Sequence, residues 1–205
     1  GVEETPRQQR KSKVAEARDG VSQVRLSAEK TALLVVDMQE RLMAVMEEDA
    51  RDRTISNIGI LLSLADRVGL PAVATEQYPK GLGQTIPEVR DAFSGFQPVE
   101  KMSFSSCGAS GFLDRLPPDK TRHVVVTGVE THVCVFQTVC DLLGSGFEVH
   151  VPSDAVCSRT RSNWETGLRL MERAGAVITS TETVVFDVLR VAGTEDFKFM
   201  SRLLK

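Results

Sequence analysis

Short apolar runs alternate along this chain with stretches in which apolar residues recur every three or four positions. The run Ala32–Val36 is uninterrupted, which is typical of a strand buried on both faces of a sheet. From Thr54 to Val68 the apolar residues follow helical spacing, and Gly69 predicts the end of that helix. The same reasoning predicts further strands over 71–75, 98–100, 123–127, 147–151 and 176–178, a loop over 76–87, and helices over 133–143, 161–174 and 183–204, the last broken near Gly193.

This order of elements predicts the fold class. Strands that alternate with helices form right-handed crossovers, which give a parallel sheet with helices on both faces. We therefore predict a three-layer, doubly wound α/β domain over 31–205 with a central, mainly parallel sheet of six strands. Residues 1–30 carry charges without periodicity and are predicted to form a mobile N-terminal extension. In such sheets the ligand crevice lies beyond the carboxyl ends of the strands, so residues that follow strands are the candidates for chemistry.

The composition narrows the class of protein. The chain has 205 residues, of which 41% are hydrophobic and 26% are charged, as expected for one globular domain. Its 25 basic and 28 acidic side chains give a net charge of −3, whereas nucleic-acid binding usually needs a clustered basic excess. No uninterrupted apolar run approaches the roughly 20 residues that span a bilayer. We therefore expect a small-molecule substrate, with no nucleic acid and no membrane as partner.

Four cysteines and three histidines raise the questions of disulfides and of a metal site. The cysteines form no CxxC pair, and the histidines form no HxH or HxxxH pair. Free thiols in a reducing compartment are therefore the expectation, rather than disulfides or a zinc knuckle. This favours a cytoplasmic protein. A mitochondrial address is the alternative, because the basic centre of segment 1–30 resembles part of a transit peptide, although acidic residues flank it.

Three residues with useful chemistry follow predicted strands. Asp37 ends the first strand, Lys101 follows the third, and Cys134 stands in the first turn of the helix after the fourth. The thiolate is the nucleophilic form of cysteine, and a helix N-terminus and a nearby ammonium both favour it. A carboxylate beside the thiol can act as general base, and backbone N–H groups at the helix start can hold an oxyanion. The trio is consistent with nucleophilic catalysis in one crevice.

The residue pattern alone also allows purely structural roles for these three residues. A cysteine in an apolar context is commonly a packed core residue, an Asp after a strand is often a helix N-cap, and a Lys there is commonly solvated. His132 is interpreted as an ordinary residue of the helix start, because positions two apart on a helix do not face each other. The other three cysteines and Trp164 are interpreted as packing residues.

Three stretches resemble a known family. They are Ala32–Gln39, Lys101–Ser105 and Thr127–Val135, and together they are similar to the isochorismatase-like cysteine hydrolases, whose relatives include nicotinamidases and N-carbamoylsarcosine amidohydrolases. The resemblance covers residues 31–192. The loop Thr75–Gly83 resembles more narrowly the isochorismatase domain-containing proteins, some of which are named as mitochondrial-associated ribonucleases.

The resemblance implies a role for each member of the trio. Cys134 would be the nucleophile, Asp37 its general base, and Lys101 the cation that holds the thiolate and the developing charge. An Asp-Lys-Cys triad of this kind defines the catalytic centre of the family.

The resemblance also implies a special turn before the cysteine. The family has a cis peptide bond in a Gly-x-x-Thr turn, which here falls between Val129 and Glu130. This bond would aim the N–H of Glu130, together with that of Cys134, at the substrate oxygen. Thr131 would brace the turn through its hydroxyl.

The chain departs from the nicotinamidases near its second strand. Nicotinamidases carry a metal-binding Asp-x-His…His set there, whereas this chain has Glu76, Gln77 and Tyr78 and no histidine. We therefore predict no catalytic metal and no cofactor. These three residues and Phe104 are candidates for binding the substrate. The family resemblance further implies a homo-oligomer, either a dimer or a tetramer.

The function that follows is hydrolysis of a non-peptide C–N bond in a small, amide-like molecule through a covalent acyl-enzyme. Some true isochorismatases lack the cysteine, so the presence of Cys134 argues against isochorismate as the substrate. Two alternatives stay open. One is a non-catalytic binding protein that keeps the fold. The other is a ribonuclease, which the acidic charge balance and the single Tyr and single Trp disfavour.

Overall fold

A parallel sheet forms the centre of the computed structural model, which describes residues 20–117 and 119–205. Its strands are β1 (Thr31–Val36), β2 (Ala72–Gln77), β3 (Val99–Lys101), β4 (His123–Val129), β5 (Glu148–Pro152), β6 (Val156–Cys157) and β7 (Val177–Thr179). Six of them lie in the order β3-β2-β1-β4-β5-β7, and β6 pairs with β4. Every pairing between these strands is parallel, which confirms the predicted fold class. The sequence pattern missed β6, because two residues are too few to show periodicity.

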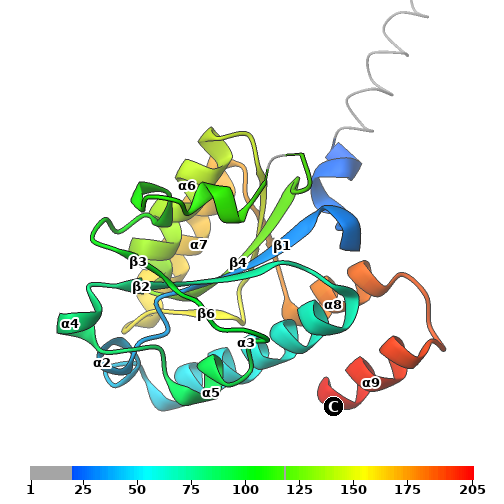
Figure 1. Ribbon diagram of the computed structural model, residues 1–205, viewed down its shortest axis with the longest axis horizontal. Coiled ribbons are helices and arrows are strands. Elements are labelled where there is room, and N and C mark those ends of the chain that lie inside the picture. Colours follow the sequence, from blue (N-terminus) through cyan, green and yellow to red (C-terminus); the bar gives the residue numbers. More distant parts are fainter. Residues whose placement is uncertain (1–19, 118) are drawn as a thin grey trace, which may run out of the picture.

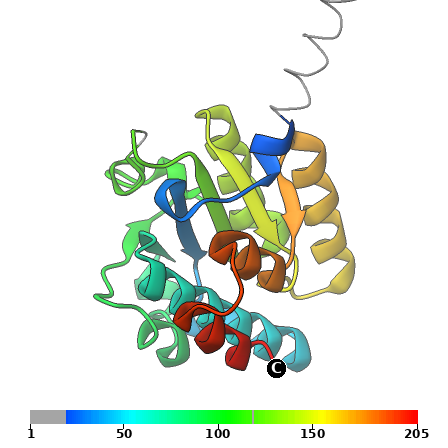
Figure 2. The same ribbon diagram turned by 90° about the vertical axis from the view of Figure 1, so that its right-hand side faces the viewer.

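Helices cover both faces of the sheet (Figures 1 and 2). They are α2 (Glu40–Met43), α3 (Glu48–Val68), α4 (Pro79–Leu82), α5 (Pro87–Arg90), α6 (Phe136–Gly144), α7 (Arg161–Ala174), α8 (Thr181–Leu189) and α9 (Glu195–Leu203). Shorter helical turns are η1 (Ala28–Lys30), η2 (Ser106–Gly108), η3 (Leu113–Arg115) and η4 (Thr131–Val135). In Figure 1, α3, α8 and α9 lie on one side of the sheet and α6 and α7 on the other.

Two hydrophobic clusters join these layers. Leu33 and Val35 of β1 belong to the cluster that includes residues of α3, α8 and α9. Leu34 and Val36 belong to the cluster that includes residues of α6 and α7. Successive side chains of a strand point to opposite faces, so a strand between two helical layers needs apolar residues at every position. This explains the uninterrupted apolar run in the sequence.

Several element boundaries differ from the prediction, most of all at α3 and in the segment after β2. Helix α3 begins at Glu48 rather than Thr54, since its first turns carry alternating charges and no apolar stripe. Glu47 accepts a hydrogen bond from the Ala50 N–H and caps this start. The predicted loop over 76–87 contains the end of β2 and the one-turn helix α4, and α5 follows at Pro87. Helix α7 has the predicted bounds.

Within the predicted N-terminal extension, the structure describes only the last part, residues 20–30. Residues 1–19 lie outside the described residues. Residues 20–30 pack on the domain: Leu26 is buried, and its backbone N–H donates to a carboxylate oxygen of Asp187, at 2.6 Å. The partner lies 161 positions away in the sequence, which is why no local pattern predicts this contact.

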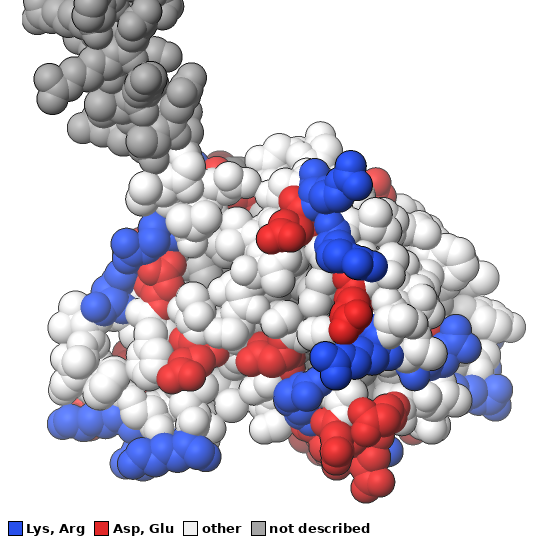
Figure 3. All heavy atoms as spheres, turned by 180° about the vertical axis from the view of Figure 1, so that it is seen from behind, with Lys and Arg blue, Asp and Glu red and all other residues white. Residues whose placement is uncertain are grey.

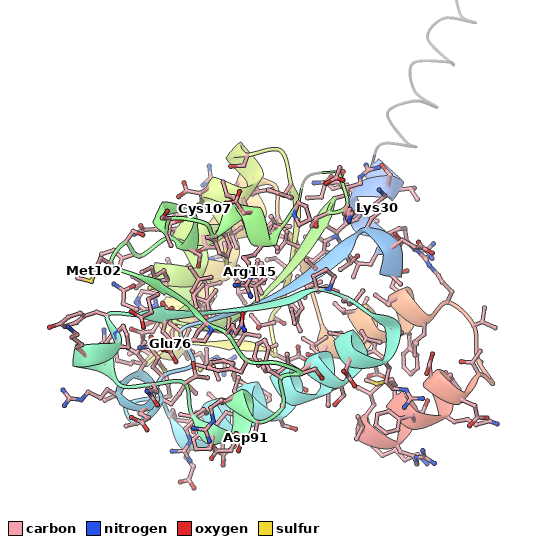
Figure 4. All side chains as sticks on the ribbon, in the orientation of Figure 1. Lys30, Glu76, Asp91, Met102, Cys107 and Arg115 are labelled. Carbon is pink, nitrogen blue, oxygen red and sulfur yellow. The ribbon has the colours of Figure 1, made fainter. Side chains whose placement is uncertain are left out.

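The strand order of the sheet reverses direction between β1 and β4. From β1 the chain continues through β2 and β3 on one side, and β4, β5 and β7 lie on the other. Such a reversal of direction opens a gap beyond the carboxyl ends of the two central strands. Figure 4 shows Met102, just after β3, at the edge opposite Lys30, which precedes β1. The carboxyl ends of the strands therefore all face the Met102 edge.

Strands β1 and β4 approach each other closely at Gly128. This residue has φ 108°, and a Cβ built there would lie 2.1 Å from the Val36 carbonyl oxygen. Only glycine fits such a position. None of the helices in the described part of the chain is long and apolar enough to cross a membrane.

Candidate active site

Asp37 is held in place at the end of β1. Its backbone has φ 49°, an uncommon conformation for a residue with a side chain. The carboxylate is fully buried, and its Oδ1 accepts a hydrogen bond of 2.8 Å from the Thr75 hydroxyl. A buried carboxylate needs a cation or several donors to stay charged, and the remaining oxygen meets such a cation.

Lys101, the last residue of β3, supplies that cation. Its Nζ lies 2.7 Å from Asp37 Oδ2 and 2.7 Å from Gln77 Oε1, and both charged side chains are shielded from solvent. The ammonium also donates to the carbonyl oxygens of Ser103, at 3.2 Å, and Phe104, at 2.8 Å. A lysine has three N–H donors, so these acceptors satisfy all of them. The ammonium is therefore fixed between two side chains and the chain segment that follows β3.

Gln77 links Lys101 to the thiol of Cys134. It is the register partner of Lys101 in the parallel pair of β2 and β3. Its Nε2 donates to the Met102 carbonyl oxygen at 3.0 Å, which turns Oε1 toward Lys101. The Cys134 Sγ lies 3.6 Å from the same Oε1. The backbone N–H of Gln77 donates to Gln39 Oε1 at 2.7 Å, so a second glutamine holds the end of β2.

Cys134 lies in the π-helical turn η4, directly after β4. The peptide bond between Val129 and Glu130 is cis, where the resemblance implied it. The cysteine is buried, with 7% of its surface exposed. Burial and the negative charge of Asp37 raise the pKa of its thiol to about 12, and the Lys101 ammonium opposes this only in part.

The raised pKa changes one expectation about the site. The sequence predicted that the helix start and Lys101 favour the thiolate, whereas the thiol is neutral at pH 7 with a pKa of about 12. Asp37 lies near enough for its negative charge and a side-chain hydrogen bond to contribute to this raised pKa.

Side chains from β6 onward hold the turn from behind. Arg159 donates to the Glu130 carboxylate through its backbone N–H, at 2.9 Å, and through Nε, at 3.2 Å. His132 Nδ1 lies 2.9 Å from the Ser158 hydroxyl. The predicted bracing by Thr131 is not found: its hydroxyl is buried and has no hydrogen-bond partner among the described residues. Contacts of the Glu130 carboxylate and of His132 hold the turn instead of the Thr131 hydroxyl.

Helix α7 packs tightly against the same turn. A Cβ built at Gly167 would lie 2.9 Å from the backbone carbon of Thr131. A side chain larger than hydrogen at this position of α7 would push the turn that carries Cys134. The turn that carries Cys134 is therefore fixed by β4 before it and by α7 beside it.

The candidate substrate residues fall into two groups. Glu76 is buried and its Oε1 accepts from both the backbone N–H and the hydroxyl of Thr85, each at 2.8 Å. The Glu76 carboxylate therefore holds the loop after β2, and Figure 4 labels this residue. Tyr78 and Phe104 are 47% and 52% exposed, and their backbones directly flank Lys101. Met102, which follows Lys101 in the chain, is exposed as well.

The described residues contain no group of three or more His, Cys, Asp or Glu side chains that could hold a metal ion. All four cysteines are free thiols. Burial raises the pKa of Cys107 and that of Cys157 to about 11, so these thiols are neutral as well. Sequence reasoning missed the roles of Gln39 and Thr75, because polar residues at strand ends give no signal of which neighbour they contact.

The fold and this site define a class of protein. The model of the isochorismatase domain matches residues 31–183, so the chain belongs to the isochorismatase family. Isochorismatase domain-containing protein 2 of Bos taurus is 36% identical over 84% of this chain and 82% of that protein. The secreted isochorismatase effector Isc1 of Phytophthora sojae is 34% identical over 88% of this chain and 87% of that protein.

A solved structure gives the same result at the level of the fold. It is described as MAR1 ribonuclease from Caenorhabditis elegans, and it has a TM-score of 0.82 and 34% sequence identity. The alignment covers 88% of this chain and 92% of that one. The chain is thus similar to family members that are described with different activities. Its own activity has to be argued from the residues of the site.

Proposed function

We propose that this protein is a cysteine hydrolase that cleaves a non-peptide C–N bond of a small, amide-like molecule through a covalent acyl-enzyme. The observation that carries the proposal is the buried contact network of the site. Asp37 and Gln77 both contact Lys101 Nζ at 2.7 Å, and Cys134 lies beside Gln77. A thiol next to a carboxylate, with that carboxylate oriented by a third group, is the arrangement that nucleophilic catalysis needs.

The first half of the reaction forms the acyl-enzyme. Cys134 Sγ attacks the carbonyl carbon while its proton moves to Asp37, which produces a tetrahedral oxyanion. Asp37 then gives the proton to the leaving nitrogen, the C–N bond breaks, and the amine departs. Because the thiol has a pKa of about 12, proton transfer and attack occur together rather than from a preformed thiolate.

The second half releases the acid. A water molecule attacks the thioester carbon and passes a proton to Asp37, and collapse of the tetrahedral intermediate breaks the C–S bond. The proton on Asp37 returns to the Cys134 sulfur, which restores the resting site. One water molecule is consumed, and one amine and one carboxylic acid are formed.

Lys101 and the turn from Glu130 to Cys134, called here the nucleophile turn, are proposed to stabilise the negative charge that develops in the reaction. The Lys101 ammonium forms a buried ion pair with Asp37, at 2.7 Å, in the resting site. The backbone N–H groups of Glu130 and Cys134 are the proposed donors to the substrate oxygen, and one such donor typically contributes about 3 kcal/mol. Gln77 positions Lys101 and the thiol relative to each other. Tyr78 and Phe104 are proposed to contact the part of the substrate away from the reacting bond.

A screen by intact-mass spectrometry tests the proposal. Small amides, ureas, carbamates and activated esters are incubated with the enzyme, and the reactions are quenched in acid during turnover. The expected result is a mass increase equal to the acyl group, located on Cys134 by peptide mapping. The variant Cys134→Ala should show neither adduct nor turnover. Cys140→Ala is the matched control, because Cys140 is a second thiol on the same segment and touches none of the proposed machinery.

Two results would overturn the proposal. Turnover of a substrate at an undiminished rate by Cys134→Ala would show that the thiol is not the nucleophile. Saturable binding of a small molecule with no adduct and no product would instead support a binding protein that keeps the fold.

Ribonuclease activity is the second candidate, because the Caenorhabditis elegans structure at 34% identity is described as a ribonuclease. Incubation of a labelled single-stranded RNA with the protein and with Asp37→Asn distinguishes the two. Cleavage by the wild-type protein that the Asp37 substitution abolishes would favour the ribonuclease. We expect no cleavage above that of a buffer control.

A further inference from the structure

A cavity lies beyond the ends of β5 and β6, behind the turn that carries Cys134. It has a volume of about 550 Å³ and is formed by the first turns of α3 and α7 together with the segments that follow the two strands. Its polar lining contains three arginines, Arg53, Arg159 and Arg161. Small-molecule sites typically have volumes of about 300–1,000 Å³, so the cavity has the size of a ligand site.

The arginines are exposed at the cavity. Arg159 and Arg161 each contact a carboxylate through Nε, of Glu130 and Glu165 respectively, and their side chains are 59% and 86% exposed. Arg53 has no ion pair or hydrogen bond with any described residue. A guanidinium presents its terminal nitrogens as a planar fork, which matches the oxygens of a carboxylate or a phosphate.

The acidic residues of the lining already have donors of their own. Asp154 Oδ1 accepts from the backbone N–H and the hydroxyl of Thr181, each at 2.9 Å. Glu47 Oε2 accepts from the Ala50 N–H at the start of α3. The N-termini of α3 and α7, helices of 21 and 14 residues, add positive partial charge to the same walls. Figure 3 shows acidic and basic side chains together on this side of the molecule, toward the carboxyl ends of the strands.

One wall of the cavity is aromatic. Trp164, in the first turn of α7, lines the cavity, and its indole N–H donates to the Ser153 carbonyl oxygen at 3.1 Å. This bond fixes the ring, so a planar apolar group can pack against it at little entropic cost. The sequence pattern led us to interpret this tryptophan as packing only, and its position on a cavity wall was not predictable from local spacing.

The cavity wall also contacts the turn that carries the nucleophile. Arg159 binds the Glu130 carboxylate, and the hydroxyl of Ser158 lies 2.9 Å from His132 Nδ1. Glu130 and His132 precede Cys134 by four and two positions in the chain. A ligand that engages Arg159 therefore acts on a group that holds the nucleophile turn.

We propose that this cavity binds a small organic anion, consisting of a carboxylate or phosphate group on a planar apolar body, and that its binding alters the environment of Cys134. The anionic group contacts Arg53 and the terminal nitrogens of Arg159 and Arg161, and the planar body packs against Trp164. The proposal is independent of the hydrolase activity, because it concerns a different cavity and a different set of side chains.

Fluorescence offers a direct test, since Trp164 is the single tryptophan of the chain. Titration with phenyl phosphate should change its emission in a saturable way, with a parallel binding heat by calorimetry, and neutral benzyl alcohol should do so much more weakly. Arg53→Gln should weaken phenyl phosphate binding about tenfold, because a charge-assisted contact is lost. Arg90→Gln is the matched control: it removes an exposed helical arginine outside the cavity and should leave the affinity unchanged.

The outcomes separate the proposal from its rivals. Absence of both binding heat and fluorescence change at millimolar phenyl phosphate would overturn it. Equal weakening by Arg53→Gln and Arg90→Gln would also overturn it, because that result indicates a nonspecific charge effect. Binding that Arg53→Gln does not affect would place the anion elsewhere.

The effect on Cys134 is measured separately as the rate of its alkylation by iodoacetamide, followed by peptide mapping. Saturating phenyl phosphate should change this rate at least about twofold, with the same concentration dependence as the fluorescence. Arg53→Gln should move both curves together. An unchanged alkylation rate at full occupancy would overturn the link between the cavity and the nucleophile.

Discussion

Asp37→Asn should make Cys134 more reactive toward alkylation while it abolishes turnover. The substitution keeps the shape of the side chain, so an oxygen can still accept from Lys101 while the amide faces Thr75. It removes the negative charge that, after burial, contributes most to the raised pKa of the Cys134 thiol. It also removes the group proposed to accept the proton. The two readouts are therefore expected to move in opposite directions.

The size of the effect follows from the pKa of Cys134. With a pKa of about 12, the thiolate fraction at pH 7.5 is about 3 in 100,000. Removal of a like charge within a few ångströms lowers a pKa by about 1–3 units, so the thiolate fraction should rise about 10- to 1,000-fold. The contribution of Asp37 to the pKa of the Cys134 thiol exceeds the opposing one of Lys101, so that pKa should fall in the variant.

Iodoacetamide alkylation of Cys134 as a function of pH measures this shift. In the wild-type protein the rate should rise about tenfold per pH unit from pH 7 to pH 10, because the thiol remains below its pKa throughout. In Asp37→Asn the whole curve should move to lower pH. With p-nitrophenyl acetate the variant should release at most one equivalent of p-nitrophenol and retain an acetyl group, because the base for water attack is missing. Slower alkylation than in the wild type, with the fold intact by circular dichroism, would refute the reasoning.

Three further predictions concern stability and metal content. Lys101→Met leaves the Asp37 carboxylate buried without its cation and should lower the free energy of unfolding in urea by about 3–5 kcal/mol. The double variant with Asp37→Asn should recover part of this loss. A loss below about 1 kcal/mol in Lys101→Met would contradict the importance of the ion pair. Gly128→Ala places a Cβ against the Val36 carbonyl oxygen and should lower the free energy of unfolding by about 3 kcal/mol or more. Gly144→Ala, with open space around the new Cβ, should leave the free energy of unfolding unchanged or raise it. Equal effects of the two substitutions would contradict the close approach of β1 and β4 at Gly128. Treatment with a chelator should leave turnover unchanged, and activity that disappears and returns with added metal would refute a metal-free mechanism.

Elements with a long periodic pattern of apolar residues were predicted more accurately than short elements. The bounds of α7 were predicted without error, because a full amphipathic stripe stands between the capping Thr160 and Gly175. Strand β6 was missed because it has two residues, and the first turns of α3 were missed because they carry charges on all sides. Residues 20–30 were assigned to an extension since their partners lie far away in the sequence.

The sequence predicted which residues come together at the candidate active site. It did not predict the contacts between them. Asp37, Lys101 and Cys134 were found because parallel strands bring residues at their carboxyl ends to one edge. The link through Gln77 depends on the register of β2 with β3, which a single strand does not encode. The pKa of the Cys134 thiol depends on burial, which reversed the expected preference for the thiolate.

The central claim is that Cys134 forms a covalent bond to the acyl group of the substrate. Rapid acid quench during turnover, followed by intact-mass spectrometry and peptide mapping, tests it most directly. The account predicts an acyl adduct on Cys134 in the wild-type enzyme and in Cys140→Ala, and neither adduct nor product with Cys134→Ala. Product formation by Cys134→Ala at the wild-type rate, with no adduct on any thiol, would contradict it.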